Sequence, residues 1–262
     1  MNLSISNIAW SAMHDEKVYE KMLELGFNGL EIAPTRVYSE NPYSKIIEAE
    51  KWAVNLQHRY GIVVCSLQSI WYGRTEKIFG TEYERKSLIT YTKRAIDFAE
   101  AVGARNVVFG CPRNRVINSD LDYNIAYEFY SEIAEYAFEH HTVLALEPNP
   151  IIYNTNFINT TEEAIALIKK IDKPGFQLNL DLGTVIYNEE NIENFVENVK
   201  VINHVHISEP GLGLIKRRKL HKNLIEMLKK IKYQKFISIE MGNQDAVDDV
   251  VKVMRYVGGL CG

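Results

Sequence analysis

The chain has 262 residues, of which 46% are hydrophobic and 24% charged, a composition typical of a globular protein with a substantial core. Its formal net charge of -4 provides no positive field that would attract a polyanion, so we expect no nucleic-acid partner. Three scattered cysteines, an N-terminus (MNLSISNIAW) without a signal-peptide pattern and the lack of any apolar run of roughly 18 residues favour a cytoplasmic protein with no membrane contact.

Eight short β-rich runs follow one another along the chain, separated by helical patterns. The runs span residues 3–10, 28–33, 62–68, 106–111, 142–148, 176–181, 202–208 and 236–241. Several helical patterns end in glycine just before the next run, as in LELGFNG, HRYGIVV and EAVGARN, which is the usual helix C-cap. Strands that alternate with helices predict a parallel sheet, and eight is the number that closes a barrel.

No Pro/Gly/Ser-rich linker and no low-complexity stretch divides the chain. We therefore predict one α/β domain over residues 1–262, a single (β/α)8 TIM barrel. Periodicity alone is also compatible with an open, doubly wound sheet.

Polar residues end most of the predicted strands, which is where barrel enzymes place their active sites. Glu31 and Gln68 end the second and third strands, and the last four strands end in Glu147, Asp181, His206 and Glu240. One such residue alone is most simply a salt-bridge partner, but four on consecutive strands would converge at one side of the barrel mouth. Three carboxylates and one imidazole suit a divalent cation, with Mn2+ the natural candidate and Mg2+, Co2+ or Zn2+ as alternatives.

The run HVH places His204 and His206 on the same face of their strand, because side chains alternate along a strand. Both are expected to face the barrel interior, with His206 nearer the mouth. We therefore predict His206 as the metal ligand and His204 as a packing group or a contact of the ligand.

The motifs ALEPNP, LNLDLGT, INHVHISEP and SIEM, together with GFNGLEIAPT, resemble the xylose isomerase-like TIM-barrel superfamily in its sugar-phosphate isomerase/epimerase branch. That branch includes ketose 3-epimerases, hydroxypyruvate isomerase and inosose dehydratase, and endonuclease IV shares the fold. The resemblance implies a single-metal site built from Glu147, Asp181, His206 and Glu240.

One position departs from the family pattern. Many members carry a histidine three residues after the strand-six aspartate, and this chain has Thr184 there. Threonine can hydrogen-bond a substrate hydroxyl but is neither a cation nor a metal ligand at neutral pH. Most of the seven histidines also lie in helices or their flanks, which disfavours the multi-metal nuclease activity.

The predicted metal site suits proton abstraction next to a carbonyl, since a divalent ion stabilises the resulting enediolate. We therefore expect an isomerase or epimerase that acts on a keto sugar or sugar phosphate, with Glu147 and Glu240 as the acid and base on opposite faces of the sugar. Two alternatives stay open, an inosose-type dehydratase and a non-catalytic carbohydrate-binding barrel.

Further residues after the predicted strands are candidates for substrate contacts. Trp10 and Trp71 could stack on a sugar ring or simply pack in the core. Arg113 could hold an anionic group or be a solvated loop charge. The expected substrate-binding set is Trp10, Gln68, Trp71, Arg113 and Thr184. A homo-oligomer is compatible with the sequence.

Overall fold

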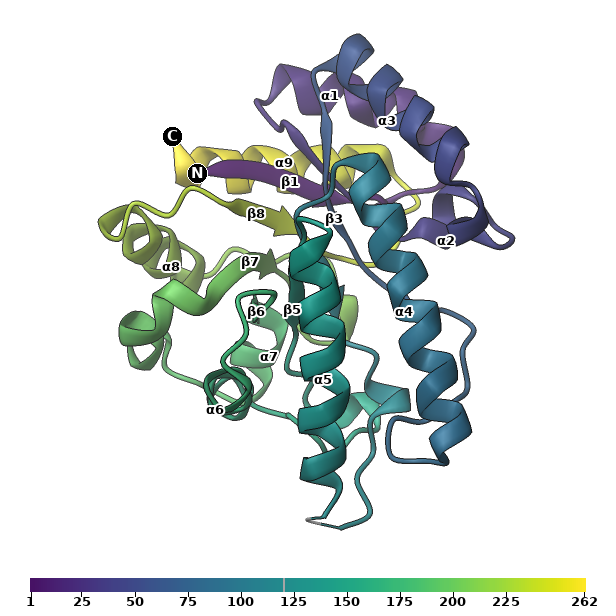
Figure 1. Ribbon diagram of the computed structural model, residues 1–262. Coiled ribbons are helices and arrows are strands. Elements are labelled where there is room, and N and C mark those ends of the chain that lie inside the picture. Colours follow the sequence, from purple (N-terminus) through teal and green to yellow (C-terminus); the bar gives the residue numbers. More distant parts are fainter. Residues whose placement is uncertain (120) are drawn as a thin grey trace.

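The computed structural model describes residues 1–119 and 121–262, and its strands form a closed parallel barrel (Figure 1). Each strand pairs with its neighbours in the sequence, and β8 pairs with β1 to close the sheet. The strands are β1 (Asn2–Ser6), β2 (Gly29–Ile32), β3 (Val63–Leu67), β4 (Val107–Phe109), β5 (Leu144–Leu146), β6 (Phe176–Asp181), β7 (Ile202–Ile207) and β8 (Phe236–Ile239). The predicted (β/α)8 barrel is confirmed, and the open sheet is excluded.

Helices surround the barrel and connect successive strands (Figure 1). The α-helices in the described ranges are α1 (Asp15–Glu24), α2 (Pro34–Val37), α3 (Ile46–Tyr60), α4 (Glu82–Val102), α5 (Asp122–Glu139), α6 (Thr161–Ile171), α7 (Leu182–Tyr187), α8 (Lys219–Lys230) and α9 (Val247–Cys261). The 3-10 helices are η1 (Asn7–Ala9), η2 (Ala12–His14), η3 (Pro42–Ser44), η4 (Pro112–Asn114), η5 (Ile151–Tyr153), η6 (Ile192–Val201) and η7 (Pro210–Leu212).

Local sequence signals explain where several helices begin and end. The Thr160 hydroxyl accepts a hydrogen bond from the backbone N–H of Glu163, and the Glu163 carboxylate accepts one from the backbone N–H of Thr160, which is a capping box. Gly61 and Gly103 end α3 and α4 with φ values of 66° and 78°, a conformation that costs glycine little. The predicted glycine C-caps are thus confirmed at these two helices.

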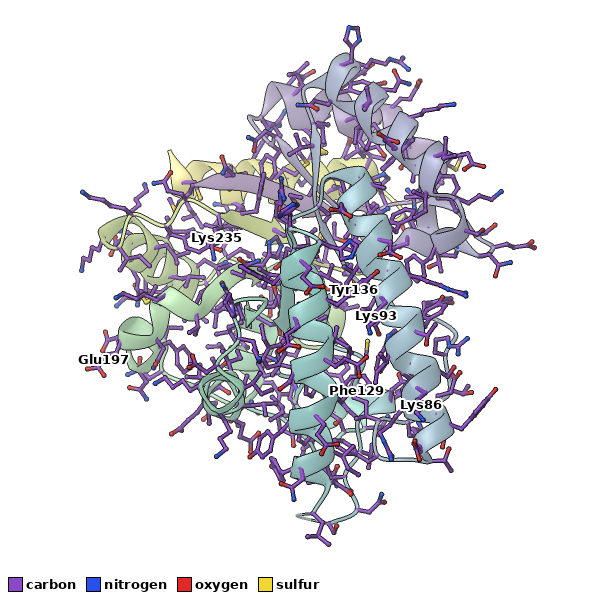
Figure 2. All side chains as sticks on the ribbon, viewed as in Figure 1. Lys86, Lys93, Phe129, Tyr136, Glu197 and Lys235 are labelled. Atoms are coloured by element: carbon purple, nitrogen blue, oxygen red, sulfur yellow. The ribbon has the colours of Figure 1, made fainter. Side chains whose placement is uncertain are left out.

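The core lies inside the barrel and between the barrel and its helices. Phe129 on α5 is buried against the aromatic ring of Phe109 on β4, whereas charged side chains such as Lys86 and Glu197 point away from the barrel (Figure 2). Among the described helices, none combines the length and the apolar character that a membrane span requires.

Most strands end earlier than the sequence patterns predicted, because the chain leaves the hydrogen-bonded ladder before the apolar run stops. β4 ends at Phe109 and β5 at Leu146, so Gly110 and Glu147 lie just beyond the ladder. Glu147 stays anchored, since its backbone N–H donates to the Phe109 carbonyl at 3.1 Å. The carboxyl ends of the strands therefore present their polar residues at one end of the barrel.

Candidate metal centre

Four side chains converge at the carboxyl ends of β5 to β8. Asp181 and His206 are the partners at the ends of β6 and β7, while Glu147 and Glu240 directly follow β5 and β8. One nitrogen or oxygen from each of the four residues lies within 4.8 Å of the others. The cluster is buried or nearly so and could hold a metal ion.

The imidazole of His206 connects this cluster to a fourth carboxylate, that of Glu31. Its Nδ1 lies 3.1 Å from Oε1 of Glu147 and 3.2 Å from Oε2 of Glu240. Its Nε2 lies 3.0 Å from Oε2 of Glu31 on β2. His206 therefore presents Nδ1 to Glu147 and Glu240 and Nε2 to a partner outside the cluster.

Glu31 also contacts the other histidine of β7. Nε2 of His204 lies 3.1 Å from the same Glu31 oxygen, and both residues are buried. His204 thus lies beside Glu31 and outside the four-residue cluster. A carboxylate behind a ligand histidine fixes the ring orientation and the proton position, and the sequence had shown Glu31 only as a polar strand end.

Burial and crowding of like charges perturb the ionisation of the cluster. Burial, with added repulsion from the Glu147 and Asp181 carboxylates, raises the pKa of Glu240 to about 7. Burial and the Glu147 charge also raise the pKa of Asp181. Burial alone would lower the pKa of His206, but the Glu240 and Glu31 carboxylates outweigh it and raise that pKa well above its ordinary value. The carboxylates of the cluster therefore strongly favour a cation among them.

Two asparagines and an arginine hold Glu147. Asn149 Nδ2 donates to Oε2 of Glu147 at 2.9 Å, and Asn179 Nδ2 donates to Oε1 at 2.8 Å. Behind them lies the fully buried guanidinium of Arg115, which donates at 2.7 Å to both the Glu147 carbonyl and Oδ1 of Asn149. Both carboxylate oxygens of Glu147 are thereby fixed in position.

Thr184 and Ser208 hold Asp181 in a similar way. The backbone N–H of Thr184 donates to Oδ2 of Asp181 at 2.7 Å, and the Thr184 hydroxyl lies 2.9 Å from the same oxygen. The Ser208 hydroxyl donates to Oδ1 of Asp181. Thr184 was expected to contact substrate, but the structure buries it against Asp181 and the Pro148 carbonyl.

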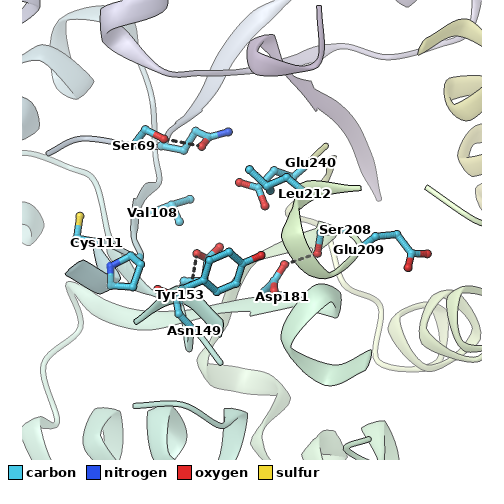
Figure 3. Close-up of a pocket in the computed structure, with 14 residues that line it drawn as sticks. Ser69, Val108, Cys111, Asn149, Tyr153, Asp181, Ser208, Glu209, Leu212 and Glu240 are labelled. Carbon is cyan, nitrogen blue, oxygen red and sulfur yellow. Dashed lines mark hydrogen bonds between the residues drawn. The ribbon is translucent and has the colours of Figure 1, made fainter. Parts of the chain in front are cut away.

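A cavity of about 180 Å³ opens beside the cluster, and Glu147, Asp181 and Glu240 line it. Figure 3 labels Asp181 and Glu240 on its wall. The cavity is smaller than the roughly 300–1,000 Å³ of sites for drug-sized ligands, which suits a small molecule. Gln68, which directly follows β3, also lines it. Tyr153 provides an aromatic wall, and its hydroxyl accepts a hydrogen bond from the Gly211 N–H at 2.9 Å.

The sequence analysis did not select Tyr153, although it is an aromatic residue in the loop after β5, which is followed directly by Glu147. Three residues that it selected lie elsewhere. Trp10 is buried with its indole N–H on Asp15, and Trp71 packs edge-on against Phe109 with its N–H on Thr92. The side chain of Arg113 is exposed outside the cavity lining. The buried Trp10 and Trp71 thus fit the packing interpretation, and the exposed Arg113 fits the solvated one.

Comparison with known proteins places this geometry in a family context. Residues 19–257 match the family model described as xylose isomerase-like TIM barrel. None of the curated proteins compared with the chain matches it by sequence.

Solved structures of similar fold include 3-keto-D-glucoside 4-epimerase from E. coli, with a TM-score of 0.79, 20% identity and coverage of 98% of both chains. D-psicose 3-epimerase from Clostridium cellulolyticum H10 has a TM-score of 0.75 and 18% identity, covering 100% of this chain and 96% of its own. A probable 3-DHS dehydratase from Bacillus anthracis has a TM-score of 0.75, 16% identity and coverage of 98% of both chains.

At these identities the structural likenesses show the fold alone. The family model, in contrast, covers most of the sequence, from α1 into α9 and through all four residues of the cluster. By this match the chain belongs to the xylose isomerase-like TIM barrel family.

Proposed function

We propose that the protein is a metal-dependent isomerase or epimerase that acts on a keto sugar or sugar phosphate. The observation that carries the proposal is the convergence of Glu147, Asp181, His206 and Glu240, whose ligand atoms lie within 4.8 Å of one another on the wall of a small cavity. Buried carboxylates this close together need a compensating cation, and the residues present fit a divalent ion.

The four residues would hold one ion, and their donor atoms indicate which ions suit the site. Three carboxylates and one imidazole nitrogen favour Mn2+, and Mg2+, Co2+ and Zn2+ accept the same ligands. A bound divalent ion supplies Lewis-acid polarisation of a substrate carbonyl and its neighbouring hydroxyl. His206 would contribute Nδ1, because Nε2 is already directed at Glu31.

Glu147 and Glu240 would move the protons. They follow strands β5 and β8, and both line the cavity. One carboxylate removes the proton next to the substrate carbonyl, and the other delivers a proton to the neighbouring carbon or to the opposite face. The Tyr153 ring would cover the reacting carbons and reduce the access of water.

The names of similar structures support a keto sugar as the substrate class. The E. coli enzyme is named a 3-keto-D-glucoside 4-epimerase, and the Clostridium enzyme is named a D-psicose 3-epimerase. Both names specify inversion at a carbon of a keto sugar. Removal of a proton from the carbon next to the carbonyl would allow this chain to catalyse an inversion of the same kind.

Two measurements test the proposal. Metal analysis of the purified protein after Mn2+ loading should give one tightly bound ion per chain. Incubation of that protein in deuterated water with a panel of ketoses should place deuterium at a carbon next to the carbonyl, together with an epimer or an aldose product.

The outcomes separate the competing functions. Loss of a hydroxyl without an epimer would identify a dehydratase and contradict the proposal. Tight sugar binding without deuterium exchange, at full metal occupancy, would identify a binding protein. Failure to bind a divalent ion would remove the basis of the mechanism.

A further inference from the structure

Resting on the proposed function, we propose that the substrate of this site is an uncharged keto sugar, with no phosphate or carboxylate group inside the cavity. The inference rests on what lines the cavity, on where the neighbouring cations are bound, and on how the surrounding backbone N–H groups are used.

The cavity wall is negatively charged. Glu147, Asp181, Glu209 and Glu240 line it, and among the described residues its lining includes no lysine, arginine or histidine. Three ionised ligand carboxylates around a divalent ion would give the centre a net charge of -1. An anionic group brought into this small volume would face repulsion without a cation to offset it.

Two guanidinium groups near the cavity, those of Arg218 and Arg115, contact partners within the protein, although Nε and Nη1 of Arg115 find no hydrogen-bond partner among the described residues. Arg218 makes a two-point ion pair with Glu209, with Nε 2.7 Å from Oε1 and Nη2 2.5 Å from Oε2. Arg115 is fully buried and directs Nη2 at the Glu147 carbonyl and at Asn149. Freeing either group for a substrate anion would leave a carboxylate or a buried carbonyl without its partner, which is costly.

Several backbone N–H groups in the loops after β7 and β8 are also engaged. Barrel enzymes that bind phosphate commonly use the loops after their seventh and eighth strands. Here Gly211 N–H donates to the Tyr153 hydroxyl at 2.9 Å, and Leu212 N–H donates to the Glu209 carbonyl at 3.0 Å. Gly242 N–H donates to the Leu212 carbonyl at 2.8 Å, and Gln244 N–H donates to the Ala9 carbonyl at 2.9 Å.

Leu212, in the loop after β7, adds an apolar side chain to the cavity lining (Figure 3). Together with the Tyr153 ring, it gives the negatively charged cavity an apolar wall. Apolar C–H faces and hydroxyl groups are what a neutral sugar offers to such a lining.

The first test compares matched substrates on the Mn2+-loaded protein. D-fructose, D-ribulose and D-xylulose are each paired with their terminal phosphate ester, and deuterium exchange and calorimetric affinity are measured for both members of every pair. The neutral member should react or bind at least about tenfold better, because like charges close together cost several kcal/mol.

A phosphate ester that equals or exceeds its neutral partner would overturn the inference while leaving the proposed function intact. If neither member of any pair exchanges or binds, although the ion is bound, the proposed function itself fails and the inference fails with it. Preferential binding of neutral sugars without exchange would support the inference and contradict the proposed catalysis.

A second test changes the charge of the wall. Leu212→Lys places a cation in the cavity lining, and the backbone there, with φ of 55°, is equally demanding for leucine and lysine. This variant should raise the affinity for the phosphate ester relative to the neutral sugar. Leu214→Lys, on an exposed residue of the same loop outside the lining, is the matched control and should leave the ratio unchanged. Equal effects of the two variants would mean that the charge of the cavity wall does not select the substrate.

Discussion

Oε2 of Glu31 lies 3.0 Å from Nε2 of His206. Glu31 is on β2 and His206 is on β7, and these two strands are not neighbours in the barrel. The contact crosses the barrel interior, and both side chains are fully buried. It leaves Nδ1 of His206 directed at the Glu147 and Glu240 carboxylates. The ring of His206 therefore contacts one carboxylate through Nε2 and two others through Nδ1.

Removing His206 should damage the metal site far more than removing His204. In His206→Ala a ligand nitrogen is lost, so Mn2+ affinity should fall by more than about 100-fold, beyond the effect expected for an outer contact. His204→Ala loses only a neighbour of Glu31, and its affinity should change much less. Calorimetric titration with Mn2+ measures both variants. Similar losses would show that the two histidines have been assigned the wrong roles.

Changing Glu31 should weaken metal binding without removing a ligand. Glu31→Gln keeps the size of the side chain but removes the negative charge beside Nε2 of His206, which makes the imidazole a poorer ligand. We expect Mn2+ affinity to fall by roughly 10–100-fold, the usual range for partners of a ligand histidine. Circular dichroism and the unfolding midpoint serve as controls for folding. An affinity equal to that of the parent protein would show that Glu31 does not support the ligand.

Glu147→Gln and Glu240→Gln should separate coordination from proton transfer. The amide oxygen can still coordinate an ion, but the amide cannot carry the proton. Turnover should fall by about 100-fold or more, in line with general acid–base contributions, while metal affinity falls less than in the matching alanine variants.

Deuterium wash-in resolves the roles of the two glutamates in an epimerase. Each Gln variant should still exchange the epimer whose proton faces the intact glutamate, giving complementary patterns for the two variants. Normal turnover in both variants would mean that neither glutamate is the acid or the base.

Gly110 should be needed for the position of Glu147. A Cβ at this residue would lie 2.7 Å from Oε2 of Glu147, so an alanine must push the carboxylate aside. Turnover of Gly110→Ala should fall by up to about 100-fold, as for other displacements of about 1 Å at an active site, with weaker Mn2+ binding. Gly259→Ala is the control, because a Cβ there meets nothing within 4 Å. Unchanged Mn2+ affinity in Gly110→Ala would show that Glu147 tolerates the displacement.

Arg115 and Arg113 should differ sharply although they lie two positions apart. Arg115→Met leaves the Glu147 carbonyl and Asn149 Oδ1 without their donor, which should cost about 1–3 kcal/mol of unfolding free energy. Arg113→Met, on an exposed side chain, should stay within about 0.5 kcal/mol of the parent. Urea denaturation gives both values. Equal stabilities of the two variants would argue against a structural role for the buried guanidinium.

The order of the strands and the four converging side chains could be predicted from the sequence. Both follow from periodicity, since each ligand ends a buried strand and all parallel strands of a barrel end on the same side. A polar side chain at the end of a buried strand costs folding free energy unless it is paired or binds an ion. His206 and Glu240 could therefore be selected from the sequence alone.

Loop side chains were harder to predict, because their directions depend on backbone turns that composition does not reveal. Ser69 has a φ of 52°, and the chain turns there, so that Trp71 packs back against Phe109. The exposed Arg113 lies within the 3-10 helix η4, and the buried Arg115 follows directly after it. The sequence indicated aromatic and cationic residues after these strands but not which ones point inward.

The chain of contacts from Arg115 through Asn149 to Glu147 has a direction, which is set by the donor at its buried end. A guanidinium can only donate, so Asn149 must turn its oxygen toward Arg115 and its NH2 group toward Glu147. Asn179 donates to the other Glu147 oxygen. Glu147 therefore accepts a hydrogen bond at each carboxylate oxygen. A buried arginine thus sets the orientation of one amide, and through it the position of a carboxylate in the cluster.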